Sequence, residues 1–143
     1  MTPRFIDTHC HVHFSVYKND ADEVTQRALD AGVGMITVGT QRTTSANAIT
    51  HAEKFEHVWA AVRLHPNHLH KMHIDEDELP AFETRAEVFD ADYYRALAQN
   101  PKVVALGETG FDAYHLPEGV TLTEVMLAQE KNWDLIVSDY HLG

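Results

Sequence analysis

Short apolar runs separated by longer polar and amphipathic stretches set the pattern of this chain. An apolar run of about four to eight residues that is bounded by turn residues is typical of a strand buried on both faces of a sheet. The runs predict four such strands, at Phe5–Cys10, Met35–Gly39, Val58–His65 and Val103–Glu108.

The stretches between the predicted strands carry helix signals. Asp20 and its neighbours place acidic residues in a first helical turn, and Gly32 ends that helix. A second helix is predicted from a cap at Thr43 to Ser45 through about Phe55, and a third over Glu87–Gln99. Asp75–Phe82 is acidic and contains Pro80, which predicts a loop or a ragged helix.

The alternation of strand and helix predicts an α/β fold with a parallel sheet and right-handed crossovers. In such sheets, reactive residues gather at the carboxyl ends of the strands, where the connecting loops meet. Three of the predicted strands follow this rule: His9 and His11 close the first, His65 ends the third, and Glu108 ends the fourth.

His9 and His11 form a His-x-His pair. Side chains two apart on a strand point the same way, so both imidazoles can reach one cation while Cys10 faces the other side. Asp7 has the same parity and is a candidate to orient His9. The alternative is a pair of polar histidines on a surface turn, and the spacing alone leaves both interpretations open.

Composition narrows the function classes. Twenty-two acidic residues against eleven Lys and Arg give a formal charge of -11, which argues against a general nucleic-acid binder. No apolar run approaches the ~20 residues of a membrane span, so no membrane role is expected. The lone Cys10 cannot form an internal disulfide and the N-terminus lacks a secretory signal, so we expect a cytoplasmic protein. Eleven histidines, many of them clustered, point to metal binding.

Three motifs occur in order at the ends of predicted strands. They are Asp7-Thr8-His9-Cys10-His11, Leu64-His65-Pro66 and Gly107-Glu108-Thr109-Gly110-Phe111-Asp112. Together they resemble the TatD family of metal-dependent hydrolases, within the amidohydrolase-like barrel group, from about Phe5 to Asp112.

The resemblance implies a partial (β/α)8 barrel and divalent metal ions, whether Mg, Mn or Zn. It implies that His9 and His11 bind one ion, that Glu108 bridges two ions, and that His65 lines the site near the substrate. The implied partner is DNA or a small phosphodiester, cleaved by a metal-activated water.

Departures from the family pattern are informative. Arg63 stands where the family usually has Gly, and it is either a phosphate contact or a side chain that fills the pocket. His68, His70 and His73 lie in a loop-like segment and are expected to be solvated. Asp112 is not expected to be a ligand.

A closed barrel of this type takes ~250 residues, so the chain amounts to about four to five βα units. We expect residues 1–143 to form one incomplete hydrolase domain, with residues 120–143 a divergent tail. In that tail, Asp134–Ser138 is either a fifth strand, with Ser138 or Asp139 at a ligand position, or part of a stretch that resembles a response-regulator receiver strand, with Asp139 as its phosphoacceptor.

The alternative to an enzyme is a catalytically inactive half-barrel remnant. Such a remnant would bind metal weakly and self-associate through its open sheet edges, because edge strands present unpaired backbone groups.

Overall fold

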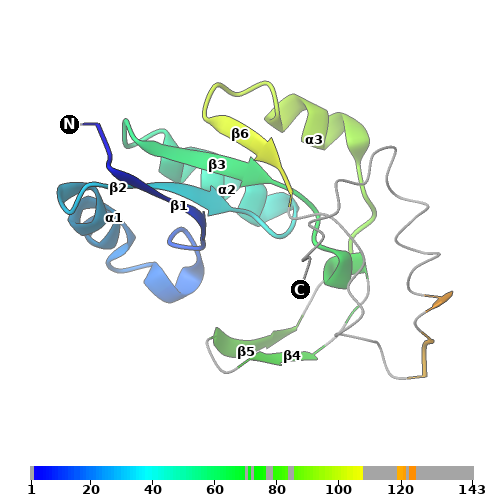
Figure 1. Cartoon of the computed structure of the whole chain (residues 1–143). Helices are drawn as coiled ribbons and strands as arrows, with labels where there is room; N and C mark the ends of the chain where they lie inside the picture. The colour runs from blue at the N-terminus through cyan, green and yellow to red at the C-terminus, as the bar shows by residue number, and fades with distance from the viewer. Residues whose placement is uncertain are drawn as a thin grey trace.

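The structure, a computed structural model, describes residues 2–69, 71, 73–76, 79–83, 86–107, 119–121 and 123–124. Strands and helices alternate along this part of the chain (Figure 1). In chain order the elements are β1 (Phe5–Cys10), the 3₁₀ helix η1 (Ser15–Tyr17), α1 (Ala21–Asp30), β2 (Val33–Val38), α2 (Arg42–Ala52), β3 (Val58–Val62), the 3₁₀ helix η2 (Pro66–Leu69), β4 (His73–Glu76), β5 (Leu79–Glu83), α3 (Ala91–Leu97) and β6 (Val103–Leu106).

Four parallel strands form one sheet in the order β1-β2-β3-β6. The spatial order follows the sequence order, as expected when each crossover returns the chain to the next position in the sheet. The predicted α/β fold with a parallel sheet is therefore confirmed. All four carboxyl ends therefore lie at the same end of the sheet, where His9 and His11 at the end of β1 and His65 after β3 also lie.

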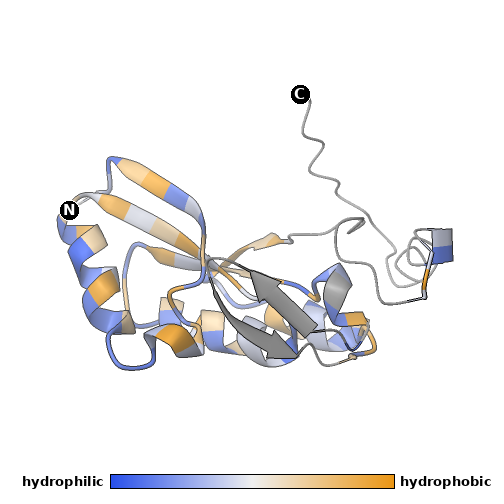
Figure 2. Cartoon of the chain, turned by 90° about the horizontal axis from the view of Figure 1, so that it is seen from below, coloured by the Kyte–Doolittle hydropathy of each residue, from blue (hydrophilic) through white to orange (hydrophobic). Residues whose placement is uncertain are grey.

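The hydrophobic core lies between the sheet and its helices. Ala60 and Val62 of β3 and Leu64 just after it are at most 1% exposed and pack in one cluster with Ala48 and Ala52 of α2. Figure 2 shows α1 and α2 along the same side of the sheet. Because β3 is flanked by strands on both sides and covered by α2, its sequence is almost wholly apolar.

The two outer strands of this sheet are much less covered. Phe5 of β1 is 62% exposed, and Val104 and Leu106 of β6 are 51% and 61% exposed. Apolar side chains are therefore less buried on the two outer strands than in the middle of the sheet.

The acidic segment predicted as a loop or ragged helix over Asp75–Phe82 is instead part of a hairpin. β4 and β5 pair antiparallel, with Ile74 opposite Phe82. Pro80 lacks a backbone N–H, but a two-stranded hairpin tolerates it because each strand has one unpaired edge. The prediction was wrong because the pairing depends on a partner strand and not on local composition.

Two helices begin at residues other than those predicted: α2 begins earlier and α3 begins later. Helix α2 begins at Arg42, and Thr44, predicted as part of the cap, lies inside the first turn, where its Oγ1 accepts the N–H of Gln41 at 2.9 Å. Helix α3 begins at Ala91 because Asp90 caps it by accepting the N–H of Tyr93 at 3.0 Å. The acid expected to start that helix, Glu87, accepts the backbone N–H of Arg42 at 3.1 Å.

The predicted fifth strand at Asp134–Ser138 and the neighbouring Asp139 lie outside the described residues. Every helix that the structure describes falls short of the length and apolar character required to cross a membrane.

Candidate metal centre at the strand ends

A bulge in β1 shapes the first part of the site. Asp7 pairs with Met35 and Cys10 pairs with Thr37, so two residues of β1, Thr8 and His9, face a single residue of β2. Bulges of this kind redirect side chains and are frequent beside active sites. The sequence pattern gave no sign of this bulge, because it reads as an unbroken strand.

The bulge changes the predicted role of Asp7. By this register Asp7 and Cys10 share a face of the sheet, so Asp7 does not have the parity with His9 that plain alternation predicts. Its carboxylate accepts the backbone N–H of His9 at 3.0 Å instead. Asp7 therefore stabilises the bulged backbone that carries His9.

His9 and His11 lie side by side where β1 ends. Their ring centroids are 5.0 Å apart and the ring planes are inclined by 83°. His9 is exposed and His11 is half-buried. Cys10, between them, packs against the core instead of lying beside the two rings, and burial raises the pKa of its thiol.

The ring of His11 is fixed in one tautomer. Its Nδ1 lies 2.8 Å from the backbone oxygen of Val38, and a carbonyl oxygen can only accept a hydrogen bond. Nδ1 therefore carries a hydrogen, and in the neutral ring Nε2 carries the lone pair. A hydrogen bond from the other ring nitrogen to a carbonyl is the usual support of a metal-ligating histidine, so this residue fits a divalent cation.

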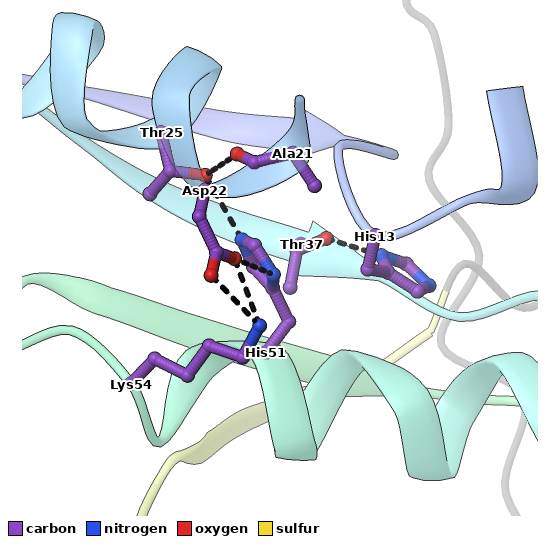
Figure 3. Close-up of polar contacts among 7 residues, drawn as sticks. All are labelled: His13, Ala21, Asp22, Thr25, Thr37, His51 and Lys54. Carbon is purple, nitrogen blue, oxygen red and sulfur yellow. Dashed lines mark hydrogen bonds and ion pairs between the residues drawn. The ribbon is translucent and has the colours of Figure 1, made fainter. Parts of the chain in front are cut away.

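His13 behaves differently from the two candidate ligands. It lies after β1 and its Nδ1 bonds Oγ1 of Thr37, a threonine with no exposed surface (Figure 3). Burial, and then the neighbouring His11 and His51, lower the pKa of His13 from 6.5 to about 3. His13 is therefore neutral, and sequence reasoning missed its partner because Thr37 lies on another strand.

Arg63 and His65 follow β3 at the same end of the sheet as the end of β1. The Nε–H of Arg63 donates to the carbonyl of Gly39 at 2.8 Å, and the residue is only 3% exposed. Of the two roles left open for Arg63, this burial favours filling space beside the end of β2. The backbone N–H of His65 donates to Thr40 at 2.7 Å, which continues the pairing of the two strand ends.

Gly39 allows helix α2 to reach this edge. A Cβ at position 39 would lie 2.4 Å from the Cα of Ser45. The Ser45 hydroxyl in turn bonds the backbone carbonyl and N–H of Arg63, at 2.9 and 3.1 Å. The absence of a side chain at Gly39 therefore lets α2 pack against the ends of β2 and β3.

The third predicted ligand, Glu108, lies outside the described residues, as do Gly110 and Asp112. The residue before it, Gly107, donates its N–H to Val62 at 3.2 Å, which places the end of β6 beside the end of β3. Within the described ranges, no three His, Cys, Asp or Glu side chains come together as a metal-binding group. The structure thus brings His9 and His11 together and leaves the place of Glu108 a prediction.

The expectation of solvated histidines after β3 is wrong for His68. That residue is 3% exposed in η2, its N–H donates to His65 at 2.9 Å, and its carbonyl accepts from Glu87 at 2.8 Å. The segment before α3 therefore bonds back to η2. His70 lies outside the described residues, and His73 begins β4.

Comparison with known proteins places these residues in a family context. Residues 6–130 match the family model described as "TatD related DNase", a family of TIM-barrel type. The match ends before the stretch that resembles a receiver strand and extends into the stretch 120–143 that was expected to diverge.

Several relatives are similar over most of this chain. It is 37% identical over 116 residues to an uncharacterized metal-dependent hydrolase, YjjV, of Escherichia coli, covering 80% of this chain and 40% of the relative. It is 30% identical over 139 residues to an uncharacterized metal-dependent hydrolase, YabD, of Bacillus subtilis, covering 92% and 49%. It is 36% identical over 99 residues to the 3'-5' ssDNA/RNA exonuclease TatD of Salmonella typhimurium, covering 68% and 33%. The chain therefore spans less than half the length of these relatives.

Proposed function

The chain belongs to the TatD-related DNase family, and we propose that it acts as a metal-dependent hydrolase that cleaves phosphodiester bonds. In this proposal His9, His11 and Glu108 bind the cation and His65 lies near the substrate. Residues 1–143 form one incomplete hydrolase domain with a divergent tail at 120–143, and the protein works in the cytoplasm, where Cys10 stays reduced.

One observation supports the proposal above the others. The hydrogen bond from His11 Nδ1 to the Val38 carbonyl leaves Nε2 as the only lone pair of that ring, and the ring of His9 is its direct neighbour. A histidine on a surface turn, the alternative that the spacing left open, would not need its tautomer fixed by the backbone of a neighbouring strand.

A divalent cation held by these residues would supply Lewis acidity, which would lower the pKa of a water and offset the negative charge of a phosphoryl group. The protein's own residues supply the placement. Asp7 secures the bulged backbone of His9, and Val38 orients His11. The buried guanidinium of Arg63 adds a positive charge at the same edge of the sheet, which favours an anionic substrate.

The substrate class we propose is single-stranded nucleic acid, because one group of relatives carries the name 3'-5' ssDNA/RNA exonuclease. The formal charge of -11 opposes binding of a long phosphate backbone. Cations bound at the strand ends would make the potential there positive. A nucleic acid that contacts the protein only through one phosphodiester at this site is therefore repelled less by the net charge than one that lies along the surface.

The test starts from metal uptake and then measures cleavage. We expect the 143-residue chain to bind Mn²⁺, Zn²⁺ or Mg²⁺ and, when loaded, to release nucleotides from end-labelled single-stranded DNA. His11→Ala should abolish both properties. His57→Ala is the matched control, because His57 precedes β3 at the opposite end of the sheet. Uptake should weaken below about pH 6.5, since imidazole must be neutral to bind metal.

A loaded wild-type protein that cleaves neither single-stranded DNA nor a simple phosphodiester would refute the catalytic proposal for this chain. Equal metal uptake by wild type and His11→Ala would refute the assignment of the site.

The exposed edge strands support a second candidate, the inactive remnant that self-associates. Phe5 at one edge and Leu106 at the other are more than half exposed, and edge strands of a parallel sheet can pair with those of another copy. Leu106→Lys should then lower the molar mass measured by light scattering at high protein concentration. A monomer at every concentration would remove this candidate.

A further inference from the structure

Two consecutive residues of β2 each bond one histidine of the β1 end. The backbone oxygen of Val38 bonds the ring of His11, and the side chain of Thr37 bonds the ring of His13. His11 has a place in the proposed function, whereas His13 has none so far. The residues that contact His13 nevertheless lie beside His11 as well.

The Thr37 hydroxyl has two partners. It bonds Nδ1 of His13 and lies 3.5 Å from the backbone oxygen of Cys10, to which it can donate. Thr37 is thus bonded both to the end of β1 and to the turn that follows it. Since Thr37 has no exposed surface, no water competes for either bond.

Phe14 connects the ring of His13 to that of His11. The Phe14 ring stacks on His11 with centroids 4.5 Å apart and planes inclined by 24°. His13 meets the same phenyl ring edge-on, with centroids 4.8 Å apart. A backbone hydrogen bond from Phe14 to His11, at 2.9 Å, closes the turn. The position of His13 therefore sets that of Phe14, which packs on the candidate ligand.

We propose that His13 and Thr37 are positioning residues for the candidate cation site, because together they anchor the turn that orients the His11 ring. The inference rests on the proposed function for the identity of the ligand. It goes beyond that function in assigning a role to a third histidine that does not itself bind the cation.

The molecule contains a matched control for this pair. Thr25 also has no exposed surface, donates its hydroxyl to Ala21 at 2.8 Å, and accepts from Nε2 of His51 at 2.9 Å. This second threonine–histidine pair joins α1 to α2, and Figure 3 shows both pairs in one view. Replacing either threonine by valine removes the same hydroxyl from an equally buried position.

The experiment compares Thr37→Val, Thr37→Ser and Thr25→Val by Mn²⁺ titration calorimetry. Loss of a group that orients a metal ligand typically weakens affinity about 10- to 100-fold, and we expect that loss in Thr37→Val. Thr37→Ser should restore the affinity, because serine can make both hydrogen bonds. Thr25→Val should bind Mn²⁺ as the wild type does, although it is also destabilised. If Thr37→Val does not fold, His13→Ala takes its place, with the same weakening expected.

A second readout needs no metal. Long-range proton–nitrogen spectra of the metal-free protein should show His11 as a single Nδ1–H tautomer in wild type and in Thr25→Val, and as a mixture in Thr37→Val. Wild-type affinity in Thr37→Val, or equal weakening in both valine variants, would overturn the inference. If wild type and His11→Ala take up Mn²⁺ equally, the proposed function fails, and the tautomer spectra still decide whether His13 positions His11.

Discussion

The two buried threonine–histidine pairs use the same hydrogen bond in different surroundings. The Thr37–His13 pair lies beside the carboxyl ends of β1 and β2, and the Thr25–His51 pair lies between α1 and α2 (Figure 3). In each pair the threonine is fully buried and its hydroxyl also reaches a backbone carbonyl, that of Ala21 at 2.8 Å and that of Cys10 at 3.5 Å.

What differs is the second nitrogen of each imidazole. Nδ1 of His51 lies 3.7 Å from the carboxylate of Asp22, which Lys54 also contacts at 2.8 Å. Nε2 of His13 is buried and makes no hydrogen bond of good geometry among the described residues, and the backbone of Thr44 is the polar group near the ring. His51 is thus coupled to surface charges, whereas His13 packs edge-on against the ring of Phe14.

The comparison teaches that a buried histidine acquires its role from what its second nitrogen and its ring face contact. The helix pair joins two elements of the scaffold. The strand-end pair joins the scaffold to a turn that carries a candidate ligand. Three predictions test how far the two pairs are alike and where they differ, in decreasing order of expected effect.

The largest effect is the loss of stability in either valine variant. Thr25→Val and Thr37→Val each leave a buried imidazole nitrogen without its hydroxyl partner, which costs about 1 to 3 kcal/mol. Urea unfolding of the metal-free variants should give similar losses, because both threonines are fully buried. A large loss in one variant and none in the other would show that the two pairs are not equivalent as packing elements.

The second effect is acid destabilisation of the metal-free protein. Burial holds the pKa of folded His13 at about 3, against 6.5 in an unfolded chain. The unfolded state therefore binds more protons than the folded state below pH 6.5. The free energy of unfolding is consequently unaffected by His13 above that pH and falls as the pH decreases toward 3. Between pH 7 and pH 5 the loss from His13 amounts to at most about 2 kcal/mol.

Burial and then the charge of Lys54 also lower the pKa of His51, so this residue adds to the acid loss in the same direction. Urea unfolding across this range should show a shallower pH dependence in His13→Gln than in wild type, and His51→Gln should change it less, because the Asp22 carboxylate favours protonated His51. Parallel curves for wild type and His13→Gln would contradict the neutral state of His13.

The smallest effect concerns the surface charges beside His51. Lys54→Met should raise the pKa of His51, because it removes a like charge, and Asp22→Asn should lower that pKa, because it removes the carboxylate that favours protonation. Both groups are largely exposed, so the change in unfolding free energy should stay below about 1 kcal/mol. Carbon–proton spectra of the histidine rings would measure both shifts, and the pKa of His13 should change far less than that of His51.

The sequence predicted the parts of the fold that depend on local periodicity. The four parallel strands appear where short apolar runs stand, and Gly32, with φ of 81°, ends the turn after α1 as predicted. The sequence did not predict the hairpin of β4 and β5. Pro80 and a run of acids are typical of a loop, and these residues form strands only because the two segments pair with each other.

The candidate site divides in the same way. The His-x-His spacing predicted that His9 and His11 share a side, and their rings are neighbours. The same parity argument misplaced Asp7, because it assumed an unbroken strand and the register of β1 contains a bulge. His68 was expected to be solvated because its segment looks polar, but it is buried, and its backbone bonds Glu87 on the far side of the β4–β5 hairpin in sequence.

By itself, the sequence predicted which residues are candidates for the site and which strands they follow, because strand periodicity and the order of motifs are properties of neighbouring residues. Only the tertiary structure decided which nitrogen of His11 carries the hydrogen that bonds Val38, why His13 is neutral, and what holds the turn between them. Those outcomes depend on Thr37 and Val38 of another strand, some 24 or more residues away. A hydrogen bond between distant segments leaves no periodic trace in the chain, and its partners meet only when the sheet has formed.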